Sequence, residues 1–483
     1  MQVSAPGKWI IGVLFVVAIY FPIFLHLDGP PVKVWDESLF AMRAYHMAEF
    51  GTYLPNFETF PGISFYRNLK PPFGTFLQAL SFKTLGVSEL SLRLPIALFV
   101  LATIGLFLFY SSKYWSTWQV GVAPALILLT SAGYLRPHVA RTGDHDTILA
   151  FWLLLSLGIA YQMGQAQKSG RLVWALAVVL FMAFLTKSVV AFFFVPAYLV
   201  YFAYAKCLLP LLRRASTYLA GVSLLGAIGL YYWLMEYTMP GFMEFVQETV
   251  LGRYVVERNQ LGRPFSFYWM ELVSSKFVPW VGLLLVNSWM LLRSNNLVFK
   301  HWSVLLWSAV VSCLLIISFS QTKLDWYDAA VYPPLALLTG WTLWEVARYF
   351  WRKPTPTQQL TYWLGLMLLC ALPYTFTLQR IHHLAWDDPL DQHAYLMRQQ
   401  QGQDYIVYCQ GFNGQVGFYA RWLNEQKGSN IQVATFWDEV PFRENNRVLV
   451  CHTEKRAQVQ AKFETEQLAA FRACTLLLLK QAK

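Results

Sequence analysis

The chain has 483 residues, of which 56% are hydrophobic, 17% aromatic and only 13% charged. Soluble domains carry about 25% charged residues, and the mean hydropathy here is +0.38. This composition excludes a disordered protein, a coiled coil, a collagen-like chain and an ordinary soluble enzyme, and it predicts a polytopic membrane protein. The net charge of +11 does not by itself imply a nucleic-acid partner, because Lys and Arg gather on the cytoplasmic loops of membrane proteins.

The first long apolar run extends from Lys8 to Leu27. A short basic segment precedes it, but no small-residue cleavage site follows it, so we expect a retained first transmembrane helix. Further apolar runs bring the predicted number of spans to about eleven; they lie near 91–110, 118–135, 147–164, 171–187, 189–206, 216–235, 276–294, 303–320, 329–349 and 359–378. The division of residues 171–206 into two spans is the least certain part of this prediction.

The charged residues of the loops predict the orientation of the chain. If the N-terminus is cytoplasmic, the Lys and Arg residues of the short loops fall on the inner side, as the positive-inside rule expects. Almost all acidic residues then fall on the outer side, with Glu345 as the exception. An odd number of spans also places residues 379–483 outside.

Residues 379–483 differ in character from the apolar part, residues 1–378. Strand-like segments at 404–409, 446–451 and 474–479 alternate with helix-like segments at 414–424 and 454–471, a pattern typical of a small soluble α/β domain. One cysteine lies in each of these strands: Cys409, Cys451 and Cys474. We expect buried thiols, and a disulfide is the alternative for an exported domain.

The first outer loop, about residues 28–90, is too long for a simple connection. Its predicted helix runs from Asp36 to about Phe50 and has one apolar face, so we expect an amphipathic helix lying on the membrane surface. Asp36 is a candidate catalytic acid, with a helix cap as its alternative role. Its neighbour Glu37 is expected to support the site rather than to act in catalysis.

Lys70 stands directly before two prolines, Pro71 and Pro72. The prolines stiffen the backbone and thereby fix the approach of the Lys70 ammonium group. A cation held near the lipid headgroups suits an anionic phosphate. The alternative is an interfacial lysine whose amine merely reaches toward water.

The second outer loop carries Asp144 and Asp146 directly before an apolar span. Two carboxylates this close to a membrane helix are costly unless they have partners. For at least one of them we expect a helix cap with an ion pair to Arg141. A divalent metal bound near Asp144 and Asp146 is the less favoured alternative.

Other ionisable groups also avoid the middle of the predicted spans and gather at their outer ends. They include Lys187, Arg253, Lys323 and Tyr327. This distribution favours a reaction site at the outer membrane face. The rival interpretation is a lipid or solute transporter without chemistry, although transporters more often place polar groups near the bilayer midplane.

In their order along the chain, these motifs resemble those of the GT-C glycosyltransferases. The likeness is to the branch that contains the lipid A aminoarabinose transferase and the protein O-mannosyltransferases, and it covers roughly residues 1–345. The motifs that carry it are Asp36-Glu37, Lys70-Pro71-Pro72, the acidic turn ending at Asp146, Leu185-Thr186-Lys187, Arg253 before Pro279-Trp280, and Thr322-Lys323-Leu324 with Tyr327 before Pro333-Pro334.

The resemblance implies a GT-C fold and an inverting transfer of a sugar from a polyprenyl phosphate, such as undecaprenyl phosphate, to a lipid, glycan or protein. It implies a bacterial inner membrane protein with a periplasmic active site. We expect no required metal or other cofactor, because two cations can neutralise a lipid monophosphate leaving group. It assigns Asp36 and Asp146 as functional acids and Lys70 and Arg253 as ligands of the donor phosphate. It leaves supporting roles to Glu37, Asp144, Lys187, Lys323 and Tyr327.

Two positions depart from the family pattern. Leu69 stands where the aminoarabinose enzyme has an acid, and Asp328 follows Tyr327 where an apolar residue or histidine is expected. These departures concern the choice of sugar and acceptor and leave the predicted reaction class in place.

Overall fold

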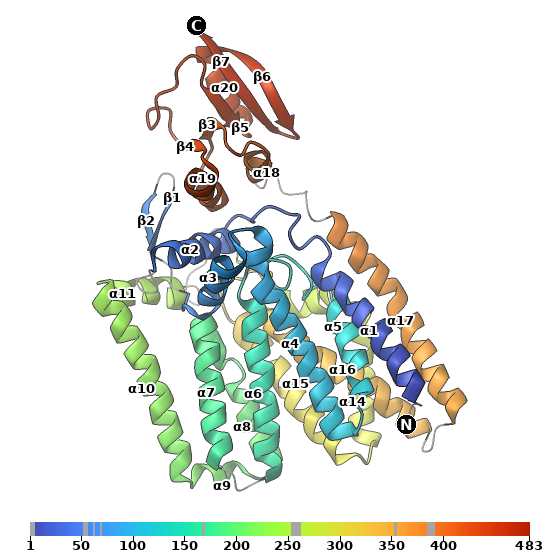
Figure 1. The fold of residues 1–483 in the computed structure, drawn as a ribbon. Helices are drawn as coiled ribbons and strands as arrows, with labels where there is room; N and C mark the ends of the chain where they lie inside the picture. The colour runs from blue at the N-terminus through green and yellow to red at the C-terminus, as the bar shows by residue number, and fades with distance from the viewer. Residues whose placement is uncertain are drawn as a thin grey trace.

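A computed structural model of the chain describes residues 5–51, 57–60, 63–67, 70–166, 170–252, 262–351, 355–383 and 392–483. A bundle of long helices forms its lower part, short helices lie across one end of that bundle, and a small α/β domain stands above them (Figure 1). The chain begins in the bundle, and its C-terminus lies at the opposite extreme of the molecule.

The bundle consists mainly of long apolar helices. They are α1 (Ala5–Phe24), α4 (Glu89–Trp115), α6 (Asp146–Ala166), α7 (Gly170–Lys187), α10 (Ala215–Thr238), α15 (Leu297–Ser318), α16 (Tyr332–Phe350) and α17 (Pro356–His383). Shorter helices lie among them or join them, namely η1 (Trp118–Gly121), α5 (Val122–Thr130), α8 (Val195–Tyr204), α9 (Leu208–Leu212), α11 (Phe242–Val246), η3 (Gln247–Leu251) and η5 (Ala329–Val331).

Within the described residues, six helices are long and apolar enough to cross a membrane. The number becomes seven if a bent pair of helices counts as one span. The predicted count of about eleven is therefore not confirmed, because several predicted spans form apolar helices of only 10–17 residues, such as Trp118–Thr130 and Val195–Tyr204. A helix needs about 20 residues to cross the hydrocarbon core of a bilayer.

Residues 171–206, whose division was uncertain, form two separate helices. α7 ends at Lys187, and the short helix η2 (Ser188–Phe192) connects it to α8. Ser188 has a positive φ of 53°, which interrupts the regular helix, and a proline near the start of α8 suits a new N-terminus.

A bent pair of helices lies between α11 and α15. The segment formed by α13 (Phe267–Glu271) and η4 (Leu272–Lys276) meets α14 (Val281–Arg293) at 107°. Lys276 ends η4, is buried, and donates to the Asp328 carboxylate at 2.9 Å. Asp328, one of the two departures from the family pattern, is therefore the counter-ion of a buried lysine, and such a pair must be kept together.

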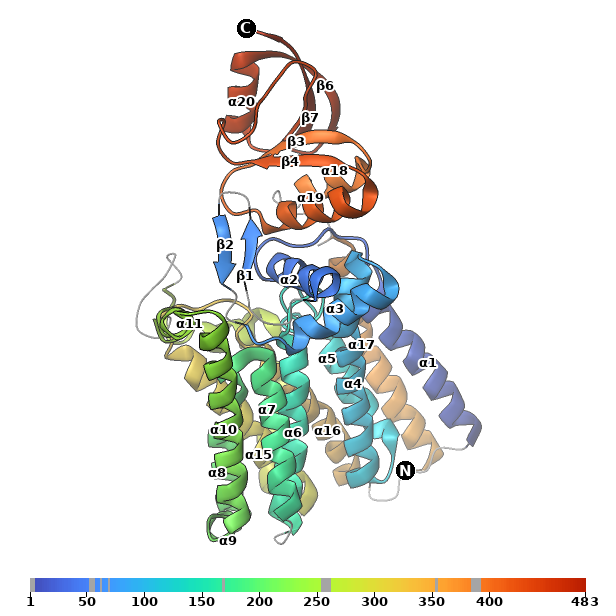
Figure 2. The same cartoon turned by 60° about the vertical axis from the view of Figure 1, so that its left-hand side comes forward.

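The helix that starts at Asp36 has its apolar face covered by protein. This helix, α2 (Asp36–Phe50), is buried on most of its faces between α3 (Phe73–Leu85) and α19 (Gly414–Lys427) of the α/β domain (Figure 2). Next to it, β1 (Phe57–Phe60) and β2 (Ile63–Arg67) form an antiparallel hairpin. The expected lipid-facing position was wrong, because protein rather than lipid covers the apolar side chains of α2.

The small α/β domain expected after the bundle is present. Its sheet has the order β4-β3-β5-β7-β6, in which β3 is parallel to β4 and β5, whereas β7 is antiparallel to β5 and β6. Its strands and remaining helices are β3 (Asp404–Tyr408), β4 (Asn430–Ala434), β5 (Arg447–Val450), β6 (Phe463–Phe471), β7 (Cys474–Ala482), α18 (Gln392–Gln399) and α20 (Thr453–Lys462). The predicted helix over 454–471 ends early, because residues 463–471 pair with β7.

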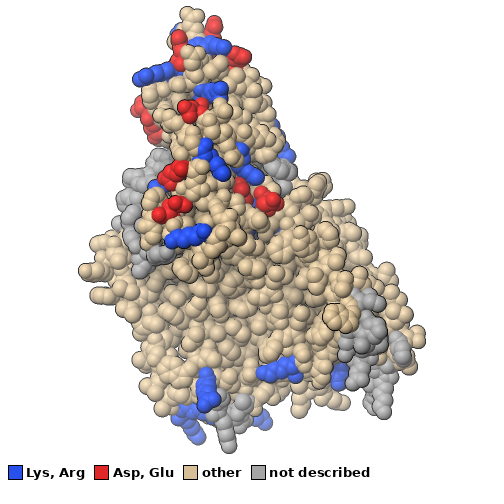
Figure 3. Space-filling view, viewed as in Figure 1, with Lys and Arg blue, Asp and Glu red and all other residues tan. Residues whose placement is uncertain are grey.

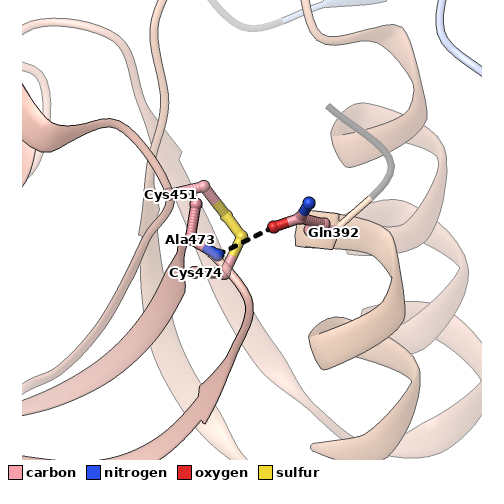
Figure 4. Close-up of a disulfide and its surroundings, with 4 residues drawn as sticks. All are labelled: Gln392, Cys451, Ala473 and Cys474. Carbon is pink, nitrogen blue, oxygen red and sulfur yellow. Dashed lines mark hydrogen bonds between the residues drawn. A yellow bond between two sulfur atoms is a disulfide. The ribbon is translucent and has the colours of Figure 1, made fainter. Parts of the chain in front are cut away.

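Two of the three cysteines in this domain form a disulfide (Figure 4). Cys451 follows β5, and Cys474 begins β7. The side chain of Gln392, at the start of α18, accepts a hydrogen bond at 3.0 Å from the backbone N–H of Ala473 next to this bridge. Cys409 is free and buried. Of the two expectations for these cysteines, the disulfide holds for one pair and the buried thiol for Cys409.

Candidate functional site

The candidate site lies at the covered end of the bundle. There α2 and α6 begin and α7 ends. Asp36, the first residue of α2, accepts a hydrogen bond from the Lys70 ammonium at 3.2 Å. The carbonyl of Lys70 in turn accepts from the Arg43 guanidinium at 2.6 Å. α2 thus provides the acid and also fixes the backbone that carries its cationic partner.

A second acid–lysine pair lies beside the first one. Asp146 is the first residue of α6, Lys187 is the last residue of α7, and their charged groups are 2.5 Å apart. The lysine that the sequence placed at the end of a span is therefore the partner of the acid that begins the preceding span.

Asp144 is fully buried in the loop before α6. Its carboxylate accepts from the Thr142 hydroxyl at 2.5 Å and lies 3.3 Å from Nδ1 of His138. The His138 ring stacks on Trp326, with centroids 4.0 Å apart. Asp144 therefore pairs with a histidine rather than with an arginine.

Electrostatic interactions join these groups into a single cluster. Burial alone would raise the pKa of Asp36, but the positive charges of Lys70, Lys187 and His138 outweigh it and hold the pKa below its usual value. Burial alone would lower the pKa of Lys70, but nearby Asp36, Asp146 and Asp144 raise it overall. At neutral pH, Asp36 is therefore a carboxylate and Lys70 an ammonium ion.

Glu37 connects three segments rather than facing the cluster. It is fully buried and accepts two hydrogen bonds from the Arg93 guanidinium, at 2.7 and 3.0 Å. It also accepts from the backbone N–H groups of Lys33 and Gly143, each at 2.7 Å. Arg93 further donates to carbonyls of the first loop, those of Leu27, Pro30 and Pro31. This pair ties the first loop and the Asp144 loop to α4.

The remaining predicted residues have different positions. Tyr327 lies close enough to Lys70 to help raise the pKa of its ammonium group. Lys323 donates to the Ser320 carbonyl, and among the described residues it forms no ion pair. Arg253 lies outside the described residues. The structure thus brings Asp36, Lys70, Asp144, Asp146 and Lys187 together and does not do so for Lys323.

The expected partner of the acidic turn, Arg141, has another role. Its guanidinium donates to the carbonyls of Pro22, Ile23 and Leu25, at or just beyond the C-terminal end of α1. The expected ion pair with Asp144 or Asp146 was therefore wrong. Cations near a helix C-terminus satisfy its free carbonyls and its dipole.

Sequence reasoning missed Arg93 and His138 as members of this region, and it considered His145 only as a possible metal ligand beside Asp144 and Asp146. His145 is fully buried, and its ring stacks on Phe40 with centroids 3.8 Å apart. Its Nε2 atom lies 3.1 Å from Oε1 of Gln78. The signal for Arg93 was its charge near the start of an apolar run, where an unpaired cation is costly. For His138 no comparable signal exists, because only the folded loop places it against Asp144.

Three residues of the cluster could together hold a metal ion. One ligand atom each from Asp36, His138 and Asp144 lie within 4.8 Å of one another. This set differs from the Asp144 and Asp146 pair that the sequence indicated, because the Lys187 ammonium already lies against Asp146.

Comparisons with known proteins agree with this architecture. Residues 69–233 match the profile of the family described as dolichyl-phosphate-mannose-protein mannosyltransferase. The protein named "Putative mannosyltransferase YkcB" of Bacillus subtilis (strain 168) is 23% identical over 215 residues, which are 43% of this chain. That match spans only 29% of YkcB.

Solved structures show the same fold over nearly the whole chain. ArnT from Cupriavidus metallidurans bound to undecaprenyl phosphate is 18% identical, with a TM-score of 0.71 and 98% of both chains covered. The Archaeoglobus fulgidus oligosaccharyltransferase tethered to an acceptor peptide has a TM-score of 0.52 at 11% identity, over 98% of this chain and 74% of that one. The predicted likeness to GT-C glycosyltransferases of the ArnT and protein O-mannosyltransferase type is therefore confirmed.

The buried pair of Glu37 and Arg93 generates a stability prediction. Arg93→Met should lower the free energy of unfolding by about 3–5 kcal/mol, because it leaves the Glu37 carboxylate buried without its counter-ion. Adding Glu37→Gln should recover part of that loss. Denaturant unfolding in detergent would measure both effects. Arg171→Met, at an exposed arginine of α7, is the control, with an expected change below about 0.5 kcal/mol. Equal losses in Arg93→Met and Arg171→Met would contradict this role.

His138 generates a pH prediction. Asp144, and more weakly Asp36 and Glu37, outweigh the effect of burial and raise the pKa of His138 above 6.5. Its contribution to stability is thus complete below about pH 6.5 and is lost as the pH rises through the raised pKa. Unfolding curves should show that His138→Gln costs about 1 kcal/mol at pH 6 and less at pH 9. The exposed His383→Gln is the control. A cost that grows with pH would contradict the pairing.

Proposed function

We propose that this protein is an inverting glycosyltransferase that moves a sugar from a polyprenyl-phosphate donor to a lipid, glycan or protein acceptor. The observation that carries the proposal is the ion pair of Asp36 and Lys70, 3.2 Å apart, inside a cluster of further acids and a second lysine. The fold around this cluster is that of ArnT, which was crystallised with undecaprenyl phosphate.

The distribution of charge supports a reaction at the outer face of a bacterial inner membrane. At the lower end of the bundle the visible charged side chains are Lys and Arg, whereas Asp and Glu side chains are visible only in the upper part of the molecule, where Lys and Arg lie among them (Figure 3). The last turns of α4, α14 and α16 lie toward this lower end, and each contains a basic residue: Lys113, Arg293 and Arg348. The exception Glu345 is buried and accepts from Ser294 at 2.6 Å. By the positive-inside rule, the end with the cluster faces the periplasm.

The donor phosphate is the natural partner of the lysines in this cluster. As the bond from the sugar to the phosphate breaks, negative charge grows on the departing lipid phosphate. Lys70 is fixed by its prolines and by Arg43, so its ammonium group is held in place before the reaction starts. Arg253, although outside the described residues, is proposed as the second phosphate ligand on the basis of the family resemblance.

The carboxylate of Asp36 suits the acceptor side of the reaction. In an inverting transfer the acceptor oxygen forms a bond to the anomeric carbon while the bond to the lipid phosphate breaks on the opposite side. A hydroxyl acceptor loses its proton to Asp36, which is worth typically 10²–10⁴-fold in rate. A phosphate acceptor carries no such proton, and Asp36 then orients it. Asp146, paired with Lys187, is proposed as the second functional acid.

The alternative of a transporter without chemistry has one observation in its favour. Lys276 and Asp328 form a buried ion pair at the sharp bend between η4 and α14, and broken helices with charged groups are common in transporters. Release of labelled sugar from a polyprenyl phosphate by the purified protein separates the two functions, because a transporter leaves that bond intact.

Two substitutions test the assigned roles. Asp36→Asn should reduce kcat by about 10³-fold, because the amide cannot accept the proton or carry the charge. Lys70→Ala should reduce kcat/KM for the donor by about 10²-fold while leaving the KM for the acceptor nearly unchanged. Radiolabelled sugar transfer in liposomes measures both.

The matched controls for these two variants are Asp28→Asn and Lys83→Ala, which change exposed residues of the first loop. Both control variants should retain wild-type rates. Full activity of Asp36→Asn would remove the assignment of the acid. A larger effect of Lys70→Ala on the acceptor than on the donor would remove the assignment of the phosphate ligand.

We also propose that the transfer needs no metal ion. Two cations, Lys70 and Arg253, can neutralise a lipid monophosphate leaving group, and a second lysine, Lys187, lies in the same cluster against Asp146. The rate should therefore change less than about two-fold after treatment with EDTA and dialysis. A loss that Mg²⁺ or Mn²⁺ restores would assign a metal to the ligand set of Asp36, His138 and Asp144 instead.

A further inference from the structure

The α/β domain contacts Trp35, the residue directly before Asp36. After β3 the chain forms a tight loop, Gly411–Gly414, which lies against the first turn of α2. The ring of Phe412 in this loop stacks on the ring of Trp35, with centroids 4.8 Å apart and an angle of 19° between the planes. Trp35 directly precedes Asp36 in the chain.

The backbone of Trp35 has a conformation that a tryptophan rarely adopts. Its φ is +72° and its ψ −124°, and no side-chain hydrogen bond caps the helix that begins there. Non-glycine residues hold such angles only when the surroundings enforce them. The Ser38 hydroxyl donates to the Trp35 carbonyl at 2.8 Å, and the stacked Phe412 holds the ring from the other domain. Both contacts act on the residue that directly precedes Asp36.

The approach of the two segments requires a glycine. A Cβ atom on Gly414 would lie 2.4 Å from the Ser38 hydroxyl oxygen and 2.9 Å from the Phe412 ring. Ser38 is fully buried, so its side chain has little room to move aside. The close contact of this loop with α2 is therefore built into the sequence of the α/β domain.

Further contacts fix the position of α19 along the rest of α2. Glu425 of α19 accepts from the Tyr45 hydroxyl at 2.5 Å, and Gln426 donates to Glu49 at 3.0 Å. One apolar core contains side chains of α2, of α3 and of the α/β domain. The loop thus packs against the first turn of α2, and α19 packs against the last turns of α2. Together, α2 and the α/β domain form one packed unit.

We propose that the α/β domain is part of the catalytic unit. In this unit Phe412 is a positioning residue that holds Trp35 and thereby aims Asp36 at Lys70, and Gly414 allows the loop of Phe412 to approach Ser38. This inference rests on the proposed transferase function and adds to it a role for residues that the family motifs do not include. Phe412 acts through Trp35 and does not itself meet the reacting atoms. Without its ring, the start of α2 gains freedom and the ion pair of Asp36 and Lys70 loses its fixed geometry.

The test compares two stacked aromatic residues of the same domain. Phe412→Ala removes the contact with Trp35. Phe442→Ala removes a similar stack, that of Phe442 on Trp437 at 4.1 Å, which lies in a different apolar core from that of α2. Phe412→Ala should lower kcat at least ten-fold with both KM values within about two-fold of wild type, because small misplacements of reacting groups are costly. Phe442→Ala should retain wild-type kcat, and Phe412→Tyr should restore most of it.

A second measurement does not depend on activity. Hydrogen–deuterium exchange of the amides of residues 36–40 should accelerate in Phe412→Ala and stay unchanged in Phe442→Ala and Phe412→Tyr. If the wild type transfers no sugar, the proposed function fails, and the exchange data alone decide the positioning role. Wild-type exchange and kcat in Phe412→Ala would overturn the inference. A raised KM for the acceptor at unchanged kcat would also overturn it, because the loop would then bind the acceptor.

Discussion

The pairing of buried charges is the constraint on which the rest of this structure depends. A charged group near the hydrocarbon region is tolerated only beside an opposite charge and with its hydrogen bonds made. Among the described residues, such pairs at the covered end of the bundle include Asp146–Lys187, Glu37–Arg93 and Lys276–Asp328, with the partly buried pair Asp36–Lys70 beside them. Each pair joins different segments of the chain, so forming the pairs also assembles the site. Charges fixed in this way need not reorganise during a reaction, which is the basis of electrostatic catalysis.

The second determinant of the site is the apolar core shared by the first loop and the α/β domain. An isolated helix of 15 residues such as α2 is only marginally stable in water, yet Asp36 must have a defined position. Packing on α3 from one side and on α19 from the other supplies that stability. The α/β domain, which carries none of the family motifs, therefore shares an apolar core with the segments that carry Asp36.

The prediction of individual elements was accurate where a local rule decides. Long apolar runs form helices. The helix break after Lys187 coincides with the positive φ of Ser188 and with a proline near the start of α8. Prediction was poor where a partner from elsewhere in the chain decides. The apolar face of α2 could be read from the sequence, but lipid and protein cover such a face equally well. Residues 463–471 have a local pattern compatible with helix, and only the ladder with β7 makes them a strand.

Composition and the order of charged residues were enough to predict a membrane protein whose acids and lysines gather at one end of its spans. The motifs and their order could also be read from the sequence, because composition and spacing are local properties of the chain. The partners of the charged groups became known from the folded chain: Asp146 pairs with Lys187 and Asp144 with His138, while Arg141 binds carbonyls at the end of α1. The physical reason is that these pairings join segments far apart in the chain. Their energies depend on distances of a few ångströms and on burial, which no spacing in the sequence encodes.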